Sequence, residues 1–194
     1  ETAGVSRVVT VDLHAGQIQG FFDIPVDHLG AAPVLAAYLK ERNLENVVVV
    51  SPDLGGVTRT RKLADRLHAP IAIIEKRRPE PGVAEVMNLI GDVEGKTAIL
   101  IDDIVDTAGS LCEGAKALAK LGAKEVYAAC SHAILTDPAI ERINASVLKQ
   151  LIVTDTIPLG DKKSDKIVVL TIADAIGDVL ISIQEHRSVS HLFR

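Results

Sequence analysis

TAILIDDIVDTAGS, the stretch at residues 97–110, decides the fold class that the sequence predicts. It begins with an apolar run at residues 97–101, continues with the adjacent carboxylates Asp102 and Asp103, and leads into a helix that we expect to begin near Leu111. Ligands of open α/β sheets bind beyond the carboxyl ends of the strands. The stretch therefore predicts a strand, a ligand-binding turn and a helix, in that order.

The turn itself has the chemistry of a phosphate site. Residues 107–110 would present backbone N–H groups and the hydroxyls of Thr107 and Ser110 at the start of a helix, which suits a dianion. Asp102 and Asp103 cannot bind phosphate, but they can accept hydrogen bonds from a sugar diol or hold Mg²⁺ through water. The combination predicts a sugar-phosphate pocket. The alternative is an ordinary helix N-cap at Ser110 beside solvated acidic residues.

Outside this stretch, short β-branched runs alternate with segments of helical period. That alternation is typical of βαβ units, so we expect an α/β fold with a mostly parallel sheet flanked by helices on both faces. The expected strands are residues 7–11, 46–51, 71–75, 97–101, 125–130 and 147–153, and the expected helices are residues 31–42, 57–67, 111–121 and 139–144. A last helix, packed on a core or on a partner subunit, is expected from one apolar stripe: Ile172, Ile176, Val179, Leu180 and Ile183.

The composition argues against several function classes. The 21 basic and 26 acidic residues leave a net charge of −5, whereas a general nucleic-acid binder is expected to be basic. No uncharged apolar run approaches the ~20 residues that span a bilayer, and Cys112 and Cys130 lack the spacing of a zinc site. We therefore expect a soluble, cytoplasmic protein with neither nucleic acid nor membrane as a partner.

Because the chain starts at Glu1 and not at Met, we also expect a processed chain or a piece of a longer one.

Two further strand ends carry residues that could bind a cation. Asp12 and His14 stand two residues apart, so both side chains can face the same side and share a metal ion; a simple hydrogen-bonded pair is the alternative. After the strand at residues 46–51, Asp53 offers one carboxylate, and the glycines at 55–56 permit close approach of the backbone to an anion. Taken alone, the segment is better explained as an ordinary turn between strand and helix.

A basic segment, Lys76, Arg77 and Arg78, opens a loop at residues 76–82 whose prolines and glycine make a helix implausible. In a net-acidic protein these cations could form a lid that closes over polyphosphate charge in a transition state, since Lys acts as a point charge and Arg as a bidentate fork. The alternative is a solvated basic loop, the usual fate of a charge run.

Residues 102–110 resemble the phosphoribosyl-binding signature of the type I phosphoribosyltransferase fold, in the form used by ribose-phosphate pyrophosphokinases, the phosphoribosyl pyrophosphate synthetases. The resemblance extends along nearly the whole chain. Residues 11–23 are similar to that family's ATP and metal segment, 51–56 to its pyrophosphate loop, 76–79 to its catalytic flexible loop and 188–193 to its C-terminus.

The resemblance implies an enzyme, a ribose-phosphate diphosphokinase that transfers diphosphate from ATP to the C1 hydroxyl of ribose 5-phosphate and yields phosphoribosyl pyrophosphate and AMP. It implies Mg²⁺ as the cofactor and gives no settled role to Asp23, Asp27 and Arg77. The implied catalytic residues are Lys76 and Arg78; the implied ribose 5-phosphate residues are Arg78, Asp102, Asp103, Asp106, Thr107, Ala108, Gly109 and Ser110; the implied metal ligands are His14, Asp53 and Asp12.

Members of that family have two similar α/β domains. The resemblance implies that residues 1–28 are the tail of an N-terminal domain whose remainder is absent, and that residues 29–194 form the C-terminal domain, with the last helix packing back on the first. It also implies homodimers assembling into hexamers, regulation by ADP or phosphate, and little activity of this piece alone. Two alternatives stay open: a non-catalytic regulatory subunit that binds phosphoribosyl pyrophosphate, and a nucleobase phosphoribosyltransferase, against which His14 and the loop at residues 76–79 argue.

Overall fold

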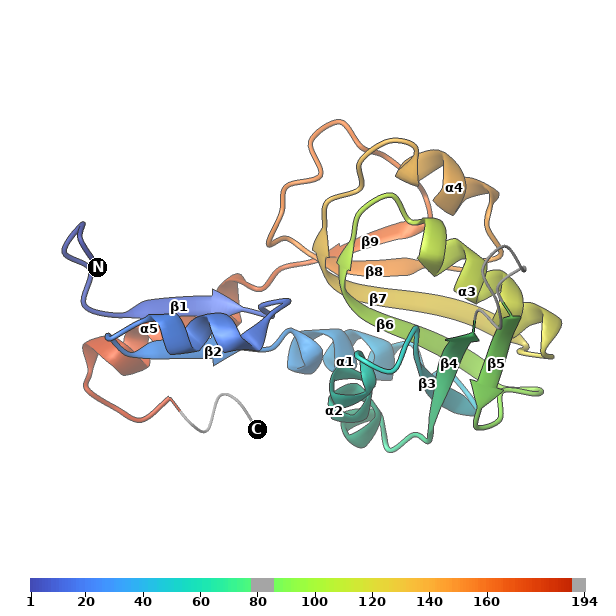
Figure 1. The fold of residues 1–194 in the computed structure, drawn as a ribbon, viewed down its shortest axis with the longest axis horizontal. Coiled ribbons are helices and arrows are strands. Elements are labelled where there is room, and N and C mark those ends of the chain that lie inside the picture. The colour runs from blue at the N-terminus through green and yellow to red at the C-terminus, as the bar shows by residue number, and fades with distance from the viewer. Residues whose placement is uncertain (78–85, 190–194) are drawn as a thin grey trace.

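The computed structural model describes residues 1–77 and 86–189, which form an α/β body and a smaller projecting lobe (Figure 1). The lobe combines β1 (Val8–Val11), β2 (Val26–Leu29) and, from the other end of the chain, α5 (Ala173–Gln184). Across the described ranges, every helix is too short or too polar to span a lipid bilayer.

The body is built on one seven-stranded sheet in the order β5-β4-β3-β6-β7-β8-β9. All neighbouring strands are parallel except β4 and β5, which are antiparallel. The predicted α/β class with a mostly parallel sheet is therefore confirmed. The strands are β3 (Val47–Ser51), β4 (Ile71–Arg77), β5 (Val86–Ile90), β6 (Thr97–Val105), β7 (Glu125–Ala133), β8 (Leu151–Thr154) and β9 (Ile167–Leu170).

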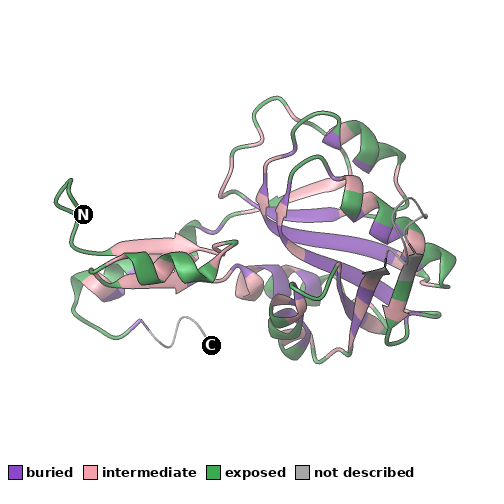
Figure 2. Ribbon diagram, in the orientation of Figure 1, coloured by how far each residue is buried: buried purple, intermediate pink, exposed green. Residues whose placement is uncertain are grey.

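Helices cover both faces of this sheet. On one face, α1 (Ala32–Glu41) and α2 (Val57–Leu67) pack on alternate strand residues such as Ile99. On the other face, α3 (Gly109–Lys120) and α4 (Ala139–Ala145) pack on the residues between them, such as Leu100. Because both faces are covered, the central strands are almost wholly buried (Figure 2).

The projecting lobe is a two-stranded parallel sheet with a helix packed against it. Leu29 of β2 and Val179 of α5 are buried together with Val189, and Val9 and Val11 of β1 pack around them. A 3₁₀ helix at Gly16–Phe21 lies between β1 and β2 in the chain. The lobe therefore joins two segments that lie far apart in the sequence.

Several boundaries differ from the expected ones. The central strand was expected to stop at residue 101, but β6 continues to Val105, so Asp102 and Asp103 lie inside the strand instead of beyond it. The extension is stabilised by the longer β7, which pairs with Asp102 and Ile104. Likewise β4 extends to Arg77 because it pairs with β5, a strand that the sequence pattern did not predict. β2 and β9 were not predicted either; each is only four residues long.

Candidate functional site

The site lies where the chain changes direction across the sheet. β3 is flanked by β4 on one side and by β6 on the other, and the helices that follow β3 and β6 pack on opposite faces. A switch of this kind opens a crevice at the carboxyl ends of the two strands, and ligands of open α/β sheets bind there. The two loops at this crevice are residues 52–56, after β3, and residues 106–108, after β6.

A cavity of about 220 Å³ lies at the end of β6 and the start of α3. Ala108, in the left-handed conformation with φ of 57°, turns the chain into α3, whose first residue is Gly109. The first N–H groups of a helix have no intrahelical acceptor, so this end of α3 suits an anion. The cavity contains the whole predicted phosphate turn; its lining residues are Asp102, Ile104, Val105, Asp106, Thr107, Ala108, Gly109, Ser110 and Leu111.

Two side chains from the segment after β7 hold this turn. Arg142 Nη1 donates a hydrogen bond to the Thr107 carbonyl at 2.9 Å, and the Thr136 hydroxyl donates to the Asp106 carboxylate. A Cβ on Gly109 would lie 3.3 Å from Arg142 Nη1, so the glycine leaves room for that contact. Sequence reasoning missed both residues, because nothing in their local pattern distinguishes them from other polar residues of a helix and a loop.

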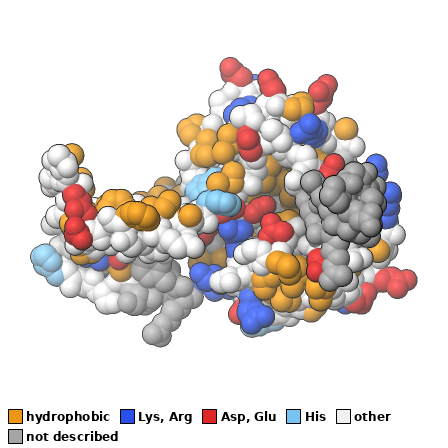
Figure 3. Space-filling view, in the orientation of Figure 1, with side chains coloured by type: hydrophobic (Ala, Val, Ile, Leu, Met, Phe, Trp, Pro, Cys, Tyr) orange, Lys and Arg blue, Asp and Glu red, His pale blue; other side chains and the backbone are white. Residues whose placement is uncertain are grey.

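Asp103 is the buried centre of a polar cluster at the same strand end. Its Oδ2 accepts a hydrogen bond from His14 Nδ1 at 2.8 Å and forms an ion pair with Arg59 Nη2, also at 2.8 Å, and its Oδ1 accepts the Ile104 N–H at 2.9 Å. Arg59 also reaches Oδ1 of Asp102 at 3.2 Å. The cluster thus joins β6, α2 and the segment after β1 (Figure 3 shows histidine, acidic and basic side chains gathered where the lobe meets the body).

The pKa values of Asp102 and Asp103 are shifted in opposite directions from the ordinary value of 3.8. Burial, together with the hydrogen bond to Asp103, raises the pKa of Asp102 to about 6. Burial acts in the same way on Asp103, but its hydrogen bonds with Asp102 and His14 and the charge of Arg59 outweigh burial, so the pKa of Asp103 is lowered. Both groups are therefore mainly ionised at neutral pH, and the half-buried Asp102 can accept hydrogen bonds from a ligand in the cavity.

The raised pKa of Asp102 makes a testable contribution to stability. Between its ordinary value of 3.8 and about 6, the folded protein binds more protons at this group than the unfolded chain does. The free energy of unfolding that this carboxyl contributes should therefore fall as the pH rises through that window. We expect Asp102→Asn to remove that decrease, as measured by urea unfolding from pH 4 to pH 7. Asp165→Asn, at an exposed carboxyl, is the matched control; an unchanged pH profile in Asp102→Asn would contradict the assignment.

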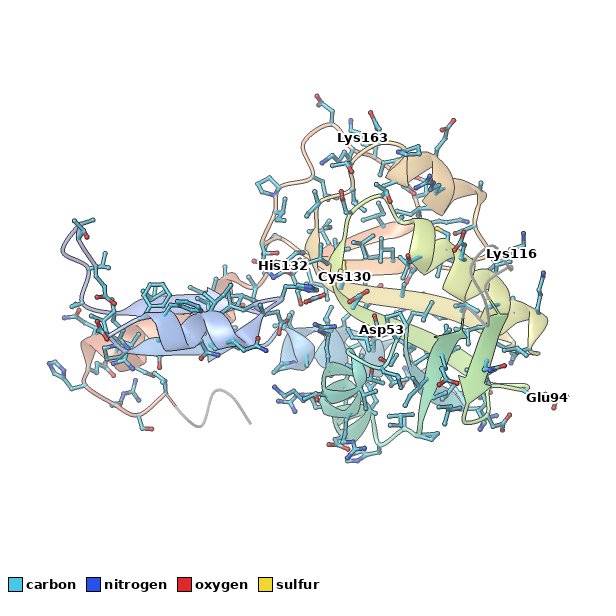
Figure 4. The ribbon with its side chains drawn as sticks, in the orientation of Figure 1. Asp53, Glu94, Lys116, Cys130, His132 and Lys163 are labelled. Carbon is cyan, nitrogen blue, oxygen red and sulfur yellow. The ribbon has the colours of Figure 1, made fainter. Side chains whose placement is uncertain are left out.

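Asp53 lies at the end of β3, beside the start of α2 (Figure 4). Its Oδ1 accepts the Gly56 N–H at 2.8 Å, and the Ser51 hydroxyl donates to its carbonyl at 2.7 Å. These bonds fold residues 51–56 into a tight turn with an exposed carboxylate. The turn interpretation and a ligand role are compatible, because only one oxygen of the carboxylate, Oδ1, accepts the Gly56 N–H.

The tightness of this turn gives a stability prediction. A Cβ on Gly56 would lie 2.7 Å from Ser51 Oγ, closer than real contacts allow. We therefore expect Gly56→Ala to lower the free energy of unfolding by about 1–3 kcal/mol, as measured by urea denaturation. Gly177→Ala in α5 is the control with the opposite sign: its Cβ would meet nothing within 4 Å, so it should stabilise by about 0.5–1 kcal/mol. Equal stabilities of the two variants would contradict the clash.

Asp12 and His14 differ in their hydrogen bonding. Asp12 uses Oδ2 to accept the Ala31 N–H at 2.8 Å and the Ser131 hydroxyl. The side chain of His14 is 76% exposed, and its Nδ1 must donate to Asp103 because a carboxylate only accepts. That leaves Nε2 of the imidazole available. A histidine whose second nitrogen is held by a carboxylate is the usual arrangement of a metal-binding histidine.

The described part of the protein therefore supplies only some of the ligands that a divalent cation needs. Within residues 1–77 and 86–189, no three His, Cys, Asp or Glu side chains are grouped closely enough to hold a metal ion. His14 and Asp53 fit as individual ligands of a Mg²⁺ ion that takes its other ligands from phosphates and water. Asp12 serves here as a structural acceptor. Asp27 forms a two-point ion pair with Arg7, and Asp23 is exposed.

The basic segment reaches the same edge of the sheet. Lys76 and Arg77 end β4, which is parallel to β3, so they follow the sheet to its ligand-binding edge. Their strand positions face Met87 and Val86 of β5. The side chains of Lys76 and Arg77, and the whole of Arg78, lie outside the described residues.

Sequence reasoning also missed Arg59, Ser131 and His132. Ser131 and His132 follow the expected strand at residues 125–130, so the rule that singled out Asp102 and Asp103 could have found them. Arg59 lies one turn after the glycines of residues 55–56, on the helix that opens at the site. Its pairing with two carboxylates of another strand has no local signal.

Comparison with known proteins is consistent with this geometry. The phosphoribosyl synthetase-associated domain family matches residues 76–194. Proteins named ribose-phosphate pyrophosphokinase from Oceanobacillus iheyensis and Bacillus caldolyticus are 61% and 63% identical over 194 residues, and these alignments cover the whole chain but 61% and 62% of the relatives. A crystal structure of phosphoribosylpyrophosphate synthetase from Mycobacterium smegmatis superposes with a TM-score of 0.87 at 41% identity, over 95% of this chain and 61% of that one. The chain thus spans about three fifths of the length of these relatives.

Proposed function

The chain belongs to the ribose-phosphate pyrophosphokinase family, and on that basis we propose that the native protein transfers diphosphate from ATP to the C1 hydroxyl of ribose 5-phosphate, releasing AMP and phosphoribosyl pyrophosphate. The observation that carries the proposal is the cavity at the end of β6, where a helix N-terminus adjoins the carboxylates of Asp102 and Asp103. A phosphate cradle beside diol acceptors has the chemistry to bind a phosphorylated sugar.

In this proposal, different residues of the cavity bind the phosphate and the ribose parts of the substrate. The 5-phosphate would lie in the turn of residues 106–110, where N–H groups and hydroxyls donate to its oxygens. Asp102 would accept hydrogen bonds from the ribose hydroxyls, since it lines the cavity and is only half buried. Asp103 is buried, so its main task would be to orient Arg59 and His14 beside the substrate.

Mg²⁺ is the proposed cofactor, and His14 and Asp53 are the residues that would hold it. When bound, the ion would neutralise phosphate charge and keep the ATP chain in one orientation. Asp12 is the third proposed ligand. Ala31 and Ser131 both donate to one oxygen of its carboxylate, Oδ2, and these bonds also support a role in shaping the segment that carries His14.

The transfer requires the C1 hydroxyl to reach the β-phosphorus in line. The new C1–O–P bond forms, and the hydroxyl proton is released to solvent, as the bond between β-phosphorus and the α-phosphate oxygen breaks and AMP leaves. Positioning and charge stabilisation supply most of the catalysis in such transfers. The cavity would fix the sugar, and Lys76 and Arg78 would stabilise charge on the leaving AMP.

Family membership is also our reason to propose a cytoplasmic location, ADP or phosphate as regulators, and homodimers that assemble into hexamers.

The deciding experiment is AMP formation from ATP by the purified native polypeptide, with ribose 5-phosphate and Mg²⁺ each left out in turn. We expect AMP and phosphoribosyl pyrophosphate in equal amounts, and only when both are present. Release of diphosphate from phosphoribosyl pyrophosphate on addition of a nucleobase would favour a phosphoribosyltransferase instead. Tight binding of phosphoribosyl pyrophosphate without AMP formation would favour a regulatory subunit. Either result would overturn the proposal.

A further inference from the structure

Two consecutive residues of β7 reach across to the projecting lobe. His132 Nε2 lies 3.1 Å from the Val11 carbonyl and 3.0 Å from the Asp12 carbonyl, and the Ser131 hydroxyl donates to the Asp12 carboxylate. Figure 4 shows His132 at the junction of the body and the lobe. No role of either residue follows from the sugar-phosphate cavity, whose lining contains neither.

The backbone at Asp12 needs such support. Its φ of 38° is a left-handed conformation, which residues other than glycine adopt at a cost and keep when their surroundings hold them. The Asp12 N–H donates to the Leu29 carbonyl at 2.9 Å, and the Asp12 carboxylate accepts the Ala31 N–H. With the contacts from β7, the residue is held through its N–H, its carbonyl and its side chain.

The His132 ring is itself fixed on both edges. Carbonyl oxygens only accept hydrogen bonds, so Nε2 must carry a proton and donate to the end of β1. On the other edge, Nδ1 lies 2.9 Å from the Thr156 hydroxyl, and Thr154 and Thr156 both contact the Ser131 carbonyl. The half-buried imidazole therefore links the end of β1 to the strand ends of the body.

The consequence falls on His14, two residues after Asp12. The left-handed turn at Asp12 redirects the chain at the end of β1, and from there His14 reaches the buried carboxylate of Asp103. Because the side chain of His14 is largely exposed, the contact with Asp103 is not enforced by packing around the ring. Its geometry depends instead on where the backbone at residues 11–12 is held.

We propose that Ser131 and His132 are positioning residues: they clamp the end of β1 onto the body and thereby hold the His14 imidazole against Asp103. This structural role is independent of the reaction. Its consequence for catalysis, the correct placement of His14 toward ATP, rests on the proposed function. A small displacement of a positioned group can lower a rate by about 100-fold, although the displaced group is still present.

The structural half is tested by NMR of the six histidine rings, with His14→Asn used to assign the His14 signals. In the unmodified protein, we expect long-range ¹H–¹⁵N correlations to show His14 with a protonated Nδ1. His132→Ala should shift His14 to the tautomer mixture of a free imidazole, and Ser131→Ala should do so in part. His132→Gln, whose amide can donate near the position of Nε2, should keep the original signal. His68→Asn, at an exposed left-handed helix end, is the matched control.

The catalytic half is tested in the native polypeptide. We expect His132→Ala to lower kcat by about 10- to 100-fold and to raise KM for ATP, with the affinity for ribose 5-phosphate changed less than about 2-fold and activity recovered in His132→Gln. An unchanged His14 signal in His132→Ala, or equal losses in the Ala and Gln variants, would overturn the proposal. If the unmodified protein forms no AMP, the proposed function fails, but the NMR result still decides the clamp.

Discussion

Replacement of Asp103 by asparagine is expected to reduce AMP formation by about 100-fold and to lower the free energy of unfolding by about 2 kcal/mol. Asp103 is 2% exposed, and one oxygen of its carboxylate accepts a hydrogen bond from His14 and forms an ion pair with Arg59. An amide of the same shape would turn either an N–H₂ group or an uncharged oxygen toward those two donors. Arg59 would then keep only Asp102 as a charged partner, at the longer distance.

The effects of Asp103→Asn can be separated from a general loss of fold. Urea unfolding gives the change in stability, and the His14 signals should show loss of the protonated Nδ1. The control is Asp161→Asn, at an exposed carboxyl in the loop before β9. It removes one negative charge, as Asp103→Asn does, but should change neither the stability nor the His14 signals. Near-normal turnover by Asp103→Asn would show that the polar cluster is not needed for the reaction.

Lys76→Ala is expected to cut turnover by about 100- to 1000-fold, with the affinity for ribose 5-phosphate changed by less than about 3-fold. The reason is that the transferred group gains charge in the transition state, whereas the proposed site of the sugar phosphate is the turn of residues 106–110. Lys76 is the penultimate residue of β4, at the ligand-binding edge, and does not belong to that turn.

The measurement pairs single-turnover kinetics with equilibrium binding of ribose 5-phosphate. Lys163→Ala, at an exposed lysine of the loop between β8 and β9 (Figure 4), is the control for loss of one positive charge. Equal losses in binding and turnover would assign Lys76 to ground-state binding of the sugar phosphate and would count against a lid.

The elements predicted best are those with a strong local pattern. The expected helix at residues 57–67 has the observed bounds of α2, because one apolar stripe and the glycines before it mark both its face and its start. Short strands such as β9 were missed, since four apolar residues without alternation carry too little local signal. Their formation depends on a neighbouring strand, which is a tertiary effect.

The turn of residues 107–110 could be predicted from the sequence, but the long-range hydrogen bonds and ion pairs around it could not. The turn at residues 107–110 is one continuous segment, so its chemistry can be read locally, and the structure places all of it in one cavity. Arg59, Ser131 and Arg142 come from three other elements and act through long-range hydrogen bonds. Even the position of Asp103 inside β6 depended on the length of β7, which stabilises the end of the strand.

The assembly of the projecting lobe has a consequence for the order of folding. Its core joins Leu29 with Val179 and Val189, so α5 cannot dock until almost all of the described chain has left the ribosome. The β3–α2–β4 and β6–α3–β7 units, by contrast, make contacts that are close in sequence and can form earlier. During synthesis the turn of residues 106–110 should therefore be structured before β1 and His14 reach their final places. Pulse-labelled hydrogen exchange during refolding should show α3 protected before α5.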